Sequence, residues 1–327
     1  MAKIFLTGAT GFVGSFVAQE LIAQQHEVSC LVRPSSDRRW LADLPVEFCI
    51  GSLLEIETFL ESLRKSEYVI HVAGVTTANN VKQYYAGNVQ PTESLLRAIE
   101  VHHPTIQRFL LVSSQAAAGP SPSAIPIDEN HPRQPITDYG ISKVQSEKLA
   151  QSYMTKIPVT IVRPPAVYGP RDDGVYNFFR LIKYGINPMI GHTDQLINLV
   201  YVEDLARGIV QAAFSPQAVG RTYFLCDETS YRWSEVARLT AQIMNKKYIT
   251  IKLPYTLIYI LSFFLEKIAA FSGVTTILNR QKMNELKRPF WVISPQRAQS
   301  DFNYRTSVQL AEGIERTVRW YRDNHWL

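Results

Sequence analysis

A tyrosine and a lysine stand four positions apart in the segment YGISK, as Tyr139 and Lys143. On a helix these positions lie one turn apart on the same face, so the ammonium can lie near the phenol. A free phenol has a pKa of about 10, which is too high for a base at neutral pH. A neighbouring cation stabilises the phenolate and lowers that pKa toward the working range. The pair therefore predicts proton transfer to or from a hydroxyl group.

A serine pair in VSSQAAAGP follows a strand predicted at 109–112. A hydroxyl at the carboxyl end of a buried parallel strand points into the crevice where open α/β sheets bind ligands. Ser114 is therefore a candidate donor to a substrate carbonyl or alkoxide as negative charge develops. A serine pair that only closes a turn is the alternative interpretation.

Three glycines, Gly8, Gly11 and Gly14, recur at three-residue spacing in TGATGFVG. They lie between an apolar run at 3–7 and a helical pattern at 15–24. A glycine-rich turn in this place lets the backbone approach a pyrophosphate, which then sits against the unpaired N–H groups of the helix N-terminus. The turn predicts dinucleotide binding.

The acidic residue that commonly holds a ribose 2′-hydroxyl is missing at the end of the next strand, 27–32. The sequence there reads LVRPSSDRR, with Arg33 in the place of the carboxylate. A guanidinium can pair with a 2′-phosphate through two hydrogen bonds, so we expect NADP in preference to NAD. Asp37 keeps NAD open, and an exposed loop arginine is the simpler alternative.

Short apolar runs alternate along the chain with segments of helical spacing. Strands are expected at 3–7, 27–32, 68–72, 109–112 and 159–163, and helices at 15–24, 57–65, 91–101 and 138–154. The alternation predicts an α/β fold, a doubly wound parallel (Rossmann) sheet with helices on both faces. We expect a dinucleotide-binding domain at 1–164, with a return segment at about 195–216, and a smaller, mixed α/β substrate lobe mainly at 165–327.

The 34 Lys and Arg residues outnumber the 29 Asp and Glu residues only slightly, and they are spread along the chain. This distribution argues against nucleic-acid binding. Cys30, Cys49 and Cys226 have no paired spacing, and no histidine has metal-ligand spacing, so no metal site is predicted. A reducing cytoplasm is expected, since the chain also starts directly with a strand and shows no secretion signal.

One apolar stretch, 254–273, reads PYTLIYILSFFLEKIAAFSG. A membrane-spanning helix needs about 20 apolar residues, and Glu266 and Lys267 interrupt this run. We therefore expect a helix packed on the substrate lobe. Contact with a membrane surface is possible but not favoured.

The ordered motifs resemble the extended short-chain dehydrogenase/reductase family, which includes nucleotide-sugar epimerases and dehydratases, over essentially the whole chain. The matching segments are TGATGFVG, HVAG, NVQPT, VSSQAAAG, YGISK, RPPAVYGP and NLVYVEDLA. The resemblance implies that Tyr139 is the acid/base, that Lys143 also holds the nicotinamide ribose, and that Ser114, five residues before Gly119, is the catalytic serine. The cofactor residues expected from the motifs and the resemblance are Gly8, Thr10, Gly11, Phe12, Val13, Gly14, Arg33, Ser52, Leu53, Val72, Ala73, Gly74, Asn88, Val112, Tyr139, Lys143, Pro164 and Val167.

Some positions depart from the family pattern. The common GDL reads Gly51-Ser52-Leu53, which loses an acid that often contacts adenine, and Pro91 replaces a small glycine at a helix start. VRPSS, SSQAAAGP and RPPAVYGP look nearest to the branch of 3β-hydroxysteroid dehydrogenases and dihydroflavonol reductases. Sugar dehydration is not expected, because Gln115 and Ala116 stand where dehydratases carry an Asp-Glu pair.

We therefore expect an NAD(P)-dependent oxidoreductase that moves hydride between nicotinamide and a secondary alcohol or ketone of a small, lipophilic, steroid- or flavonoid-like substrate. The first alternative is a nucleotide-sugar epimerase with tightly bound NAD, since it would use the same Tyr, Lys and Ser. The second is a cofactor-binding scaffold without turnover. A homodimer through two helices is common in the family. Candidate substrate contacts are Thr76, Thr77, Gln115, Ala116, Tyr168 and Tyr176.

Overall fold

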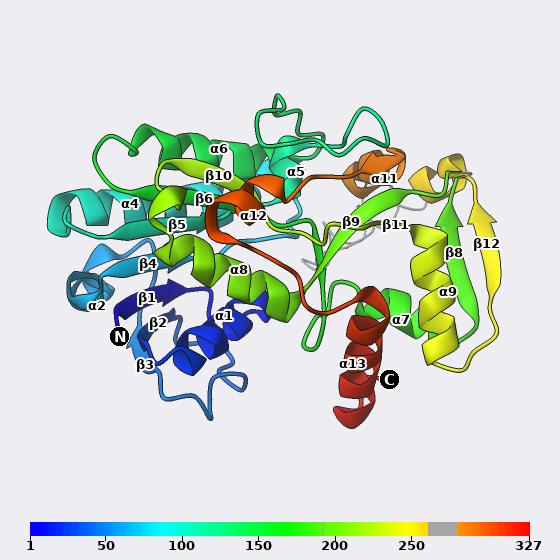
Figure 1. Ribbon diagram of the computed structural model, residues 1–327, viewed down its shortest axis with the longest axis horizontal. Helices are drawn as coiled ribbons and strands as arrows, with labels where there is room; N and C mark the ends of the chain where they lie inside the picture. Colours follow the sequence, from blue (N-terminus) through cyan, green and yellow to red (C-terminus); the bar gives the residue numbers. More distant parts are fainter. Residues whose placement is uncertain (192, 261–279) are drawn as a thin grey trace.

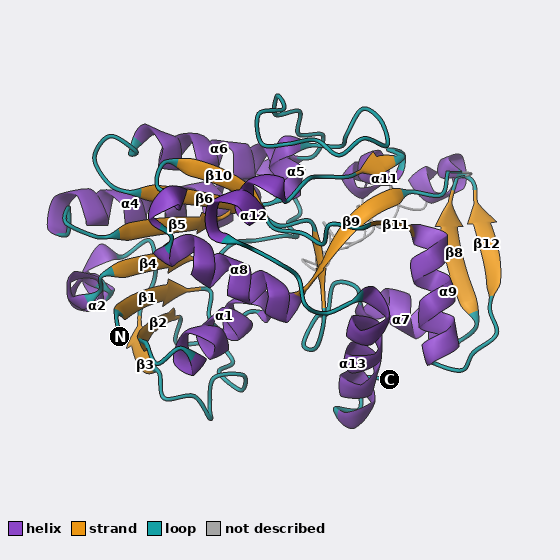
Figure 2. Ribbon diagram, viewed as in Figure 1, coloured by secondary structure: helices purple, strands orange, loops and turns teal. Residues whose placement is uncertain are grey.

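A seven-stranded parallel sheet forms the centre of the first domain, on the left in Figures 1 and 2. The computed structural model describes residues 1–191, 193–260 and 280–327. The strands run in the order β10-β6-β5-β4-β1-β2-β3. Their bounds are Lys3–Thr7 for β1, Glu27–Val32 for β2, Glu47–Ile50 for β3, Tyr68–His71 for β4, Arg108–Val112 for β5, Val159–Arg163 for β6 and Arg221–Phe224 for β10. Each neighbouring pair is parallel, which confirms the predicted doubly wound sheet.

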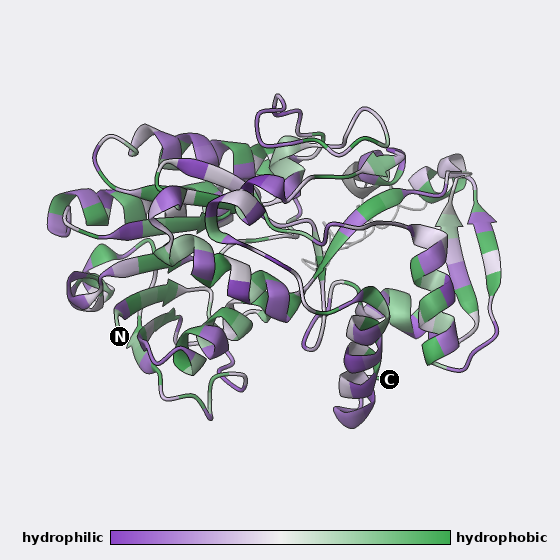
Figure 3. Ribbon diagram, in the orientation of Figure 1, coloured by the Kyte–Doolittle hydropathy of each residue, from purple (hydrophilic) through white to green (hydrophobic). Residues whose placement is uncertain are grey.

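Helices cover both faces of this sheet, because alternate side chains of each strand point to opposite faces. Ile4 and Leu6 pack into one apolar cluster, whereas Phe5 between them packs into the other. Figure 3 shows hydrophobic residues along the central strands. The first cluster is covered by α1 (Phe12–Ala23) and α8 (Val202–Phe214), and the second by α2 (Leu60–Lys65), α4 (Gln90–His102) and α6 (Asp138–Ser152).

A continuous helical run precedes and includes Pro91. It starts at α3 (Val81–Tyr84), passes through a π-helical turn at Tyr85–Val89 and continues as α4. Proline has no N–H to donate, and within this run it stands where the π-helical turn ends and α4 begins, so the regular hydrogen-bond pattern is already interrupted there. The helix thus begins ten residues before Pro91, earlier than the expected start at 91.

The C-terminal half builds a smaller, mixed α/β lobe, as expected. One sheet has the order β11-β9-β13, with β7 also paired to β9, and a separate parallel pair joins β12 to β8. A third apolar cluster lies between these strands and the lobe's helices. The strands are β7 (Ala166–Tyr168), β8 (Ile186–Ile190), β9 (Leu196–Tyr201), β11 (Ser230–Arg232), β12 (Ile249–Leu253) and β13 (Phe290–Trp291), and the helices are α7 (Tyr176–Lys183), α9 (Trp233–Ile243), α11 (Arg280–Leu286) and α13 (Leu310–Asp323). The helix α12 (Gln296–Phe302) packs instead on β10 and α8 of the first domain.

The chain returns to the first domain through α8 and β10. This return differs from the expected segment at about 195–216 at both ends. The strand β9 pairs within the lobe, whereas β10 extends the central sheet as far as Phe224 by pairing with β6. The physical reason is that β6 has a free edge beyond β5, and β10 supplies the backbone partners for it.

The apolar stretch at 254–273 falls only partly within the described chain. Its first residues form a helical turn in which Ile258 is buried and Leu257 is exposed. The residues from 261 onward lie outside the described part. Among the helices that are described, none has the length and apolar content needed to cross a bilayer.

Candidate active site

Two helix N-caps position the predicted catalytic residues. Ser114 follows β5 and caps the short helix α5 (Gln115–Ala118), where its Oγ accepts a hydrogen bond from the Ala116 N–H at 3.1 Å. Thr137 caps α6 in the same way by accepting from the Gly140 N–H at 3.1 Å. Serine and threonine are preferred at this position for that reason. The caps bring the first turn of α6, with Tyr139, beside the end of β5.

Lys143 lies one turn further along α6 and is almost completely buried, with 5% of its surface exposed. Its Nζ donates to the Val112 carbonyl at 2.9 Å, at the carboxyl end of β5. Burial lowers the pKa of Lys143 to about 8, and the Glu147 carboxylate acts in the opposite direction. The ammonium is therefore held rigidly between α6 and the central sheet.

The phenol of Tyr139 behaves differently from the expectation based on sequence. Burial is the largest effect and raises the pKa of Tyr139 to about 12, while a hydrogen bond with Ser114 lowers it. The Lys143 ammonium is engaged with a backbone carbonyl and is not among the causes of this pKa shift. The expected lowering of the phenol pKa by Lys143 is therefore not found, and desolvation is the largest effect. Tyr139 is a protonated acid at neutral pH.

Asn88 ties α6 to the loop that follows β4. Its amide donates to the Val75 carbonyl at 3.0 Å and to the Ser142 Oγ at 2.9 Å, and its Oδ1 accepts from the Val75 N–H at 2.7 Å. A Cβ atom on Gly74 would lie 2.9 Å from Asn88 Oδ1 and 3.4 Å from Lys143 Nζ. Three of the predicted cofactor residues, Gly74, Asn88 and Lys143, therefore lie side by side.

Sequence reasoning missed a buried charge cluster behind these residues. The Glu147 side chain is completely buried and accepts from Ser113 Oγ at 2.6 Å and from Arg163 Nε and Nη2 at 2.8 and 2.6 Å. Arg133 Nη1 adds a fourth contact at 3.2 Å. The available signal was the spacing, because Glu147 follows Lys143 by four residues and so shares its face of α6.

The glycine turn has the shape that a dinucleotide pyrophosphate needs. A Cβ on Gly14 would lie 2.0 Å from the Gly8 carbonyl oxygen, and one on Gly8, where φ is +77°, would lie 2.5 Å from the Ala73 nitrogen. The N-cap of α1 is Gly11, which supplies no side-chain cap, and the first turn carries no acidic residue. The N–H groups of Phe12 and Val13 can therefore receive a phosphate. These residues fit the cofactor that the motif predicts.

The other predicted cofactor residues follow the carboxyl ends of the parallel strands. Arg33 is exposed directly after β2, and Ser52 and Leu53 come just after β3. Val72 and Ala73 follow β4, Val112 ends β5, and Pro164 and Val167 follow β6. Thr10 lies in the glycine turn. The fold thus brings this set to one edge of the sheet, where such folds bind ligands, and the role of each residue stays a prediction.

The predicted substrate contacts separate into two groups. Thr76 and Thr77 follow β4, and Gln115 and Ala116 follow Ser114 directly, so all four lie at the edge that carries the catalytic cluster. Within the described chain the buried Nε2 of Gln115 has no hydrogen-bond partner.

Of the two tyrosines of this predicted set, Tyr168 is buried in the lobe and Tyr176 is partly buried there. Tyr168 has 6% of its surface exposed and lies against Tyr201, and Tyr176 donates to the Trp326 carbonyl and packs on Tyr321. Substrate contact by these residues remains a prediction.

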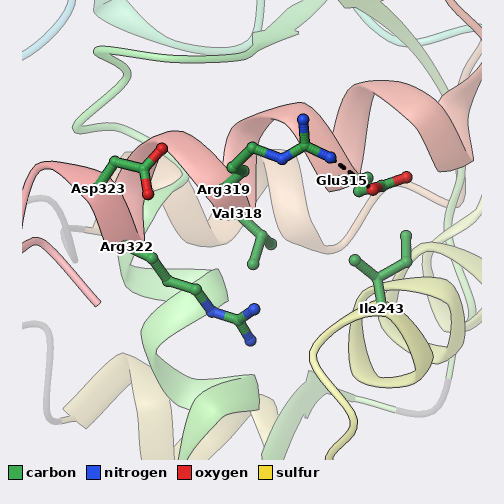
Figure 4. A pocket seen from close by; sticks show the side chains of 6 residues that line it. All are labelled: Ile243, Glu315, Val318, Arg319, Arg322 and Asp323. Atoms are coloured by element: carbon green, nitrogen blue, oxygen red, sulfur yellow. Dashed lines mark hydrogen bonds and ion pairs between the residues drawn. The ribbon is translucent and has the colours of Figure 1, made fainter.

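A surface hollow of about 520 Å³ lies elsewhere, between α9 and α13 (Figure 4). Its lining consists of Ile243, Glu315, Val318, Arg319, Arg322 and Asp323, and Arg319 pairs with Glu315 at 2.9 Å. None of these residues belongs to the catalytic cluster or to the predicted cofactor set. The predicted catalytic and cofactor residues thus lie at the edge of the central sheet and away from this hollow.

The comparison with known protein families agrees with this geometry. The model of the NAD-dependent epimerase/dehydratase family matches residues 4–226, which cover the glycine turn, Ser114, Tyr139 and Lys143. The chain belongs to this family. Membership confirms the resemblance seen in the motifs and makes the chain an NAD-dependent enzyme of oxidoreductase or epimerase type.

Relatives within the family include both a reductase and an epimerase. The chain is 28% identical to the ceramide reductase of Caulobacter vibrioides, over 99% of this chain and 96% of that protein. It is 27% identical to the N-acetyl-alpha-D-glucosaminyl-diphospho-ditrans,octacis-undecaprenol 4-epimerase of Escherichia coli O157:H7, over 78% of this chain and 76% of that one. The structure of UDP-glucuronic acid 4-epimerase from Bacillus cereus in complex with NAD has the same fold, with a TM-score of 0.79 at 20% identity and 99% of each chain covered.

Proposed function

We propose that this enzyme is an NADPH-favouring reductase that converts a ketone of a lipophilic small molecule to a secondary alcohol. The observation that carries the proposal is the arrangement of three side chains at the end of β5, where Tyr139 contacts Ser114 and lies one helical turn from the buried Lys143 ammonium. A protonated acid suits the reducing direction, in which an alkoxide oxygen has to receive a proton.

Three side chains share the work at the reacting oxygen. When bound, the nicotinamide ring supplies the hydride to the carbonyl carbon. Ser114 Oγ accepts from the Ala116 N–H and is hydrogen-bonded to the Tyr139 phenol, so its proton can turn from the phenol to the carbonyl oxygen as that oxygen gains negative charge. Tyr139 gives its proton to the same oxygen. Lys143 does not act on the resting phenol, and we propose that its ammonium leaves the Val112 carbonyl to stabilise the phenolate once that charge has formed.

Lys143 has to be charged for this role. Its pKa of about 8 means that the ammonium is present at neutral pH but is lost in mildly alkaline solution. Reduction should therefore be fastest below that pH and fall above it.

The preference for NADPH rests on the loop after β2. Arg33 is exposed there, and Arg38 and Arg39 follow five and six residues later. Arg39 pairs with Asp37 at 2.9 Å and Arg38 lies over the ring of Phe48, whereas Arg33 is the first residue after β2. A 2′-phosphate would bring the opposite charge to this loop.

The lipophilic substrate is supported by the similarity to the ceramide reductase along nearly the full length of both chains. The apolar sequence after Pro254 fits the same reading. We further propose that the enzyme works in the cytoplasm, since its three cysteines are free and buried, and that it forms a homodimer through two helices.

The catalytic assignment is tested with Tyr139→Phe. The variant keeps the ring packed against Tyr84, whose centroid lies 6.1 Å away, and removes only the hydroxyl. Turnover of ketones with NADPH should fall by a factor on the order of a hundred or more, while the Kd for NADPH stays within about twofold. Tyr84→Phe is the matched control and should retain turnover. Full activity in Tyr139→Phe would refute the mechanism.

A second candidate is a 4-epimerase with tightly held NAD, favoured by the similarity to the lipid-linked sugar 4-epimerase. Calorimetric titration with NADPH and NADH distinguishes the two, with Arg33→Asp as the control. A preference for NADPH that disappears in Arg33→Asp supports the reductase. Tighter binding of NADH, or NAD that stays with the protein through purification, would favour the epimerase.

A further inference from the structure

Arg171 lies in the loop between β7 and α7 and reaches across to the first domain. Its Nη1 donates to the Ser15 Oγ at 3.0 Å. The guanidinium carbon lies 4.5 Å from the ring centroid of Phe16 and 5.1 Å from that of Trp40. The backbone of Arg171 has a φ of +71°, a conformation that non-glycine residues rarely adopt. The side chain is thus held against α1 by contacts from two separate segments of the first domain.

Within the described chain, the guanidinium of Arg171 has no carboxylate partner. Among the described residues none forms an ion pair with it, and its buried Nε has no hydrogen-bond partner. Glu203 acts on it only from a distance, and that carboxylate is itself paired with Arg316 at 3.1 Å. A partly buried guanidinium without a counter-charge is unfavourable, so an anion is expected to complete this environment.

The position of Ser15 indicates where that anion would bind. Ser15 belongs to the first turn of α1, which begins at Phe12. The N-terminal end of a helix carries partial positive charge and repels a cation. In α1 this charge is not offset, since the first turn has no acidic residue and the Gly11 cap contributes no side chain. Two positive features therefore converge beside the glycine turn.

We propose that Arg171 binds the pyrophosphate of the nicotinamide dinucleotide, as a cation supplied by the C-terminal lobe to the glycine turn of the first domain. The inference rests on the dinucleotide binding that forms part of the proposed function. It assigns Arg171 a role in holding the two parts of the chain together around the cofactor, because the loop it belongs to connects directly to α7 of the lobe.

A purely structural role would not need the charge. Packing on Phe16 and Trp40 could be provided by an uncharged side chain of similar length. Arg171→Met keeps that packing and removes the charge and the donors, and Arg171→Lys keeps the charge without the planar group. Both variants are compared with the wild type by calorimetric titration with NADPH and with NADH, at several salt concentrations, after thermal unfolding confirms that they are folded.

We expect Arg171→Met to weaken NADPH and NADH binding equally, by about ten- to a hundredfold, since both share the pyrophosphate. The salt dependence of binding should also become weaker than in the wild type. Arg171→Lys should retain most of the affinity. If Arg171→Met does not fold, Arg171→Gln, which can still donate to Ser15, takes its place.

Three results would overturn the assignment. The first is an unchanged affinity of Arg171→Met for both dinucleotides. The second is a loss of affinity confined to NADPH, which would mean that Arg171 contacts the 2′-phosphate. The third is a loss of affinity with unchanged salt dependence, which would mean that the side chain acts only by packing. Failure of the wild type to bind either dinucleotide would instead refute the proposed function. Tyr139→Phe separates the two further, because it should lose turnover and keep the affinity that Arg171→Met loses.

Discussion

Substitution of Glu147 tests how α6, the helix that carries Tyr139 and Lys143, is held against the central sheet. Its carboxylate is completely inaccessible to solvent and receives contacts from Ser113, Arg133 and Arg163, and only 4% of the Arg163 side chain is exposed. Glu147→Gln keeps the size of the side chain and one acceptor oxygen but removes the negative charge. Breaking a buried ion pair on one side costs about 3 to 5 kcal/mol. Because one oxygen remains, we expect a loss near 3 kcal/mol in the free energy of unfolding.

The assay is urea unfolding followed by tryptophan fluorescence and by circular dichroism, with the slope checked for equality between variant and wild type. Glu61→Gln is the control, because Glu61 forms an exposed pair with Lys65 and its loss should leave the midpoint nearly unchanged. The double variant Glu147→Leu with Arg163→Met should recover much of the lost stability, since no unpaired charge remains buried. A loss below about 1 kcal/mol in Glu147→Gln would refute this reasoning.

Glu147 should also affect the pH dependence of turnover. Its charge raises the pKa of Lys143, which burial otherwise lowers to about 8. Without that charge the pKa of Lys143 falls, so the alkaline loss of kcat/KM should move to lower pH in Glu147→Gln. Loosened packing alone would lower the rate at all pH values without moving this limb. The comparison of the two pH profiles therefore separates an electrostatic role from a structural one.

Three further perturbations test other parts of the site. In the wild type kcat/KM should decline as the pH rises through about 8, the pKa of Lys143. Lys143→Arg should abolish that decline, because a guanidinium keeps its charge. Stopped-flow rates between pH 6 and pH 10 check both expectations. Burial lowers the pKa of His71 to about 3, so the folded protein does not bind the proton that the unfolded chain binds below about pH 6.5, and the free energy of unfolding falls as the pH decreases. In urea titrations His71→Asn should lose about 3 kcal/mol less of this free energy between about pH 6.5 and pH 4 than the wild type does. Equal losses in the two proteins would argue against this explanation. Gly14→Ala should weaken NADPH binding by roughly tenfold or more in calorimetry, because its Cβ would lie 2.0 Å from the Gly8 oxygen, whereas Gly11→Ala, at 3.3 Å, should have a smaller effect.

Much of the site could be predicted because its residues lie in short, local patterns. The glycine turn depends on a strand, three glycines and a helix that are adjacent in sequence, and Tyr139 and Lys143 share one turn of one helix. The parallel sheet followed from the alternation of apolar runs, since each crossover has one favoured hand. The edge strand β10 did not follow, because it is contributed by a segment far along the chain.

Contacts between distant segments needed the tertiary structure. The Arg163 guanidinium meets Glu147 only when β6 and α6 pack together, and Arg171 meets Ser15 across 156 positions. The pKa of Tyr139 was also outside the reach of sequence, because burial depends on every segment that covers the phenol. The packing of Tyr168 and Tyr176 within the lobe could not be predicted from the sequence, which shows only that both follow the strand expected at 159–163.

The sequence by itself thus determined the family, because its ordered motifs match the family model, and it predicted the chemistry through the residue types and spacings of Ser114, Tyr139 and Lys143. It also determined the sheet through its apolar periodicity. Only the tertiary structure decided the electrostatic state of the groups, protonated for Tyr139 and marginally charged for Lys143. The reason is that pattern and propensity act locally, whereas desolvation and ion pairing depend on which distant segments exclude water from a group.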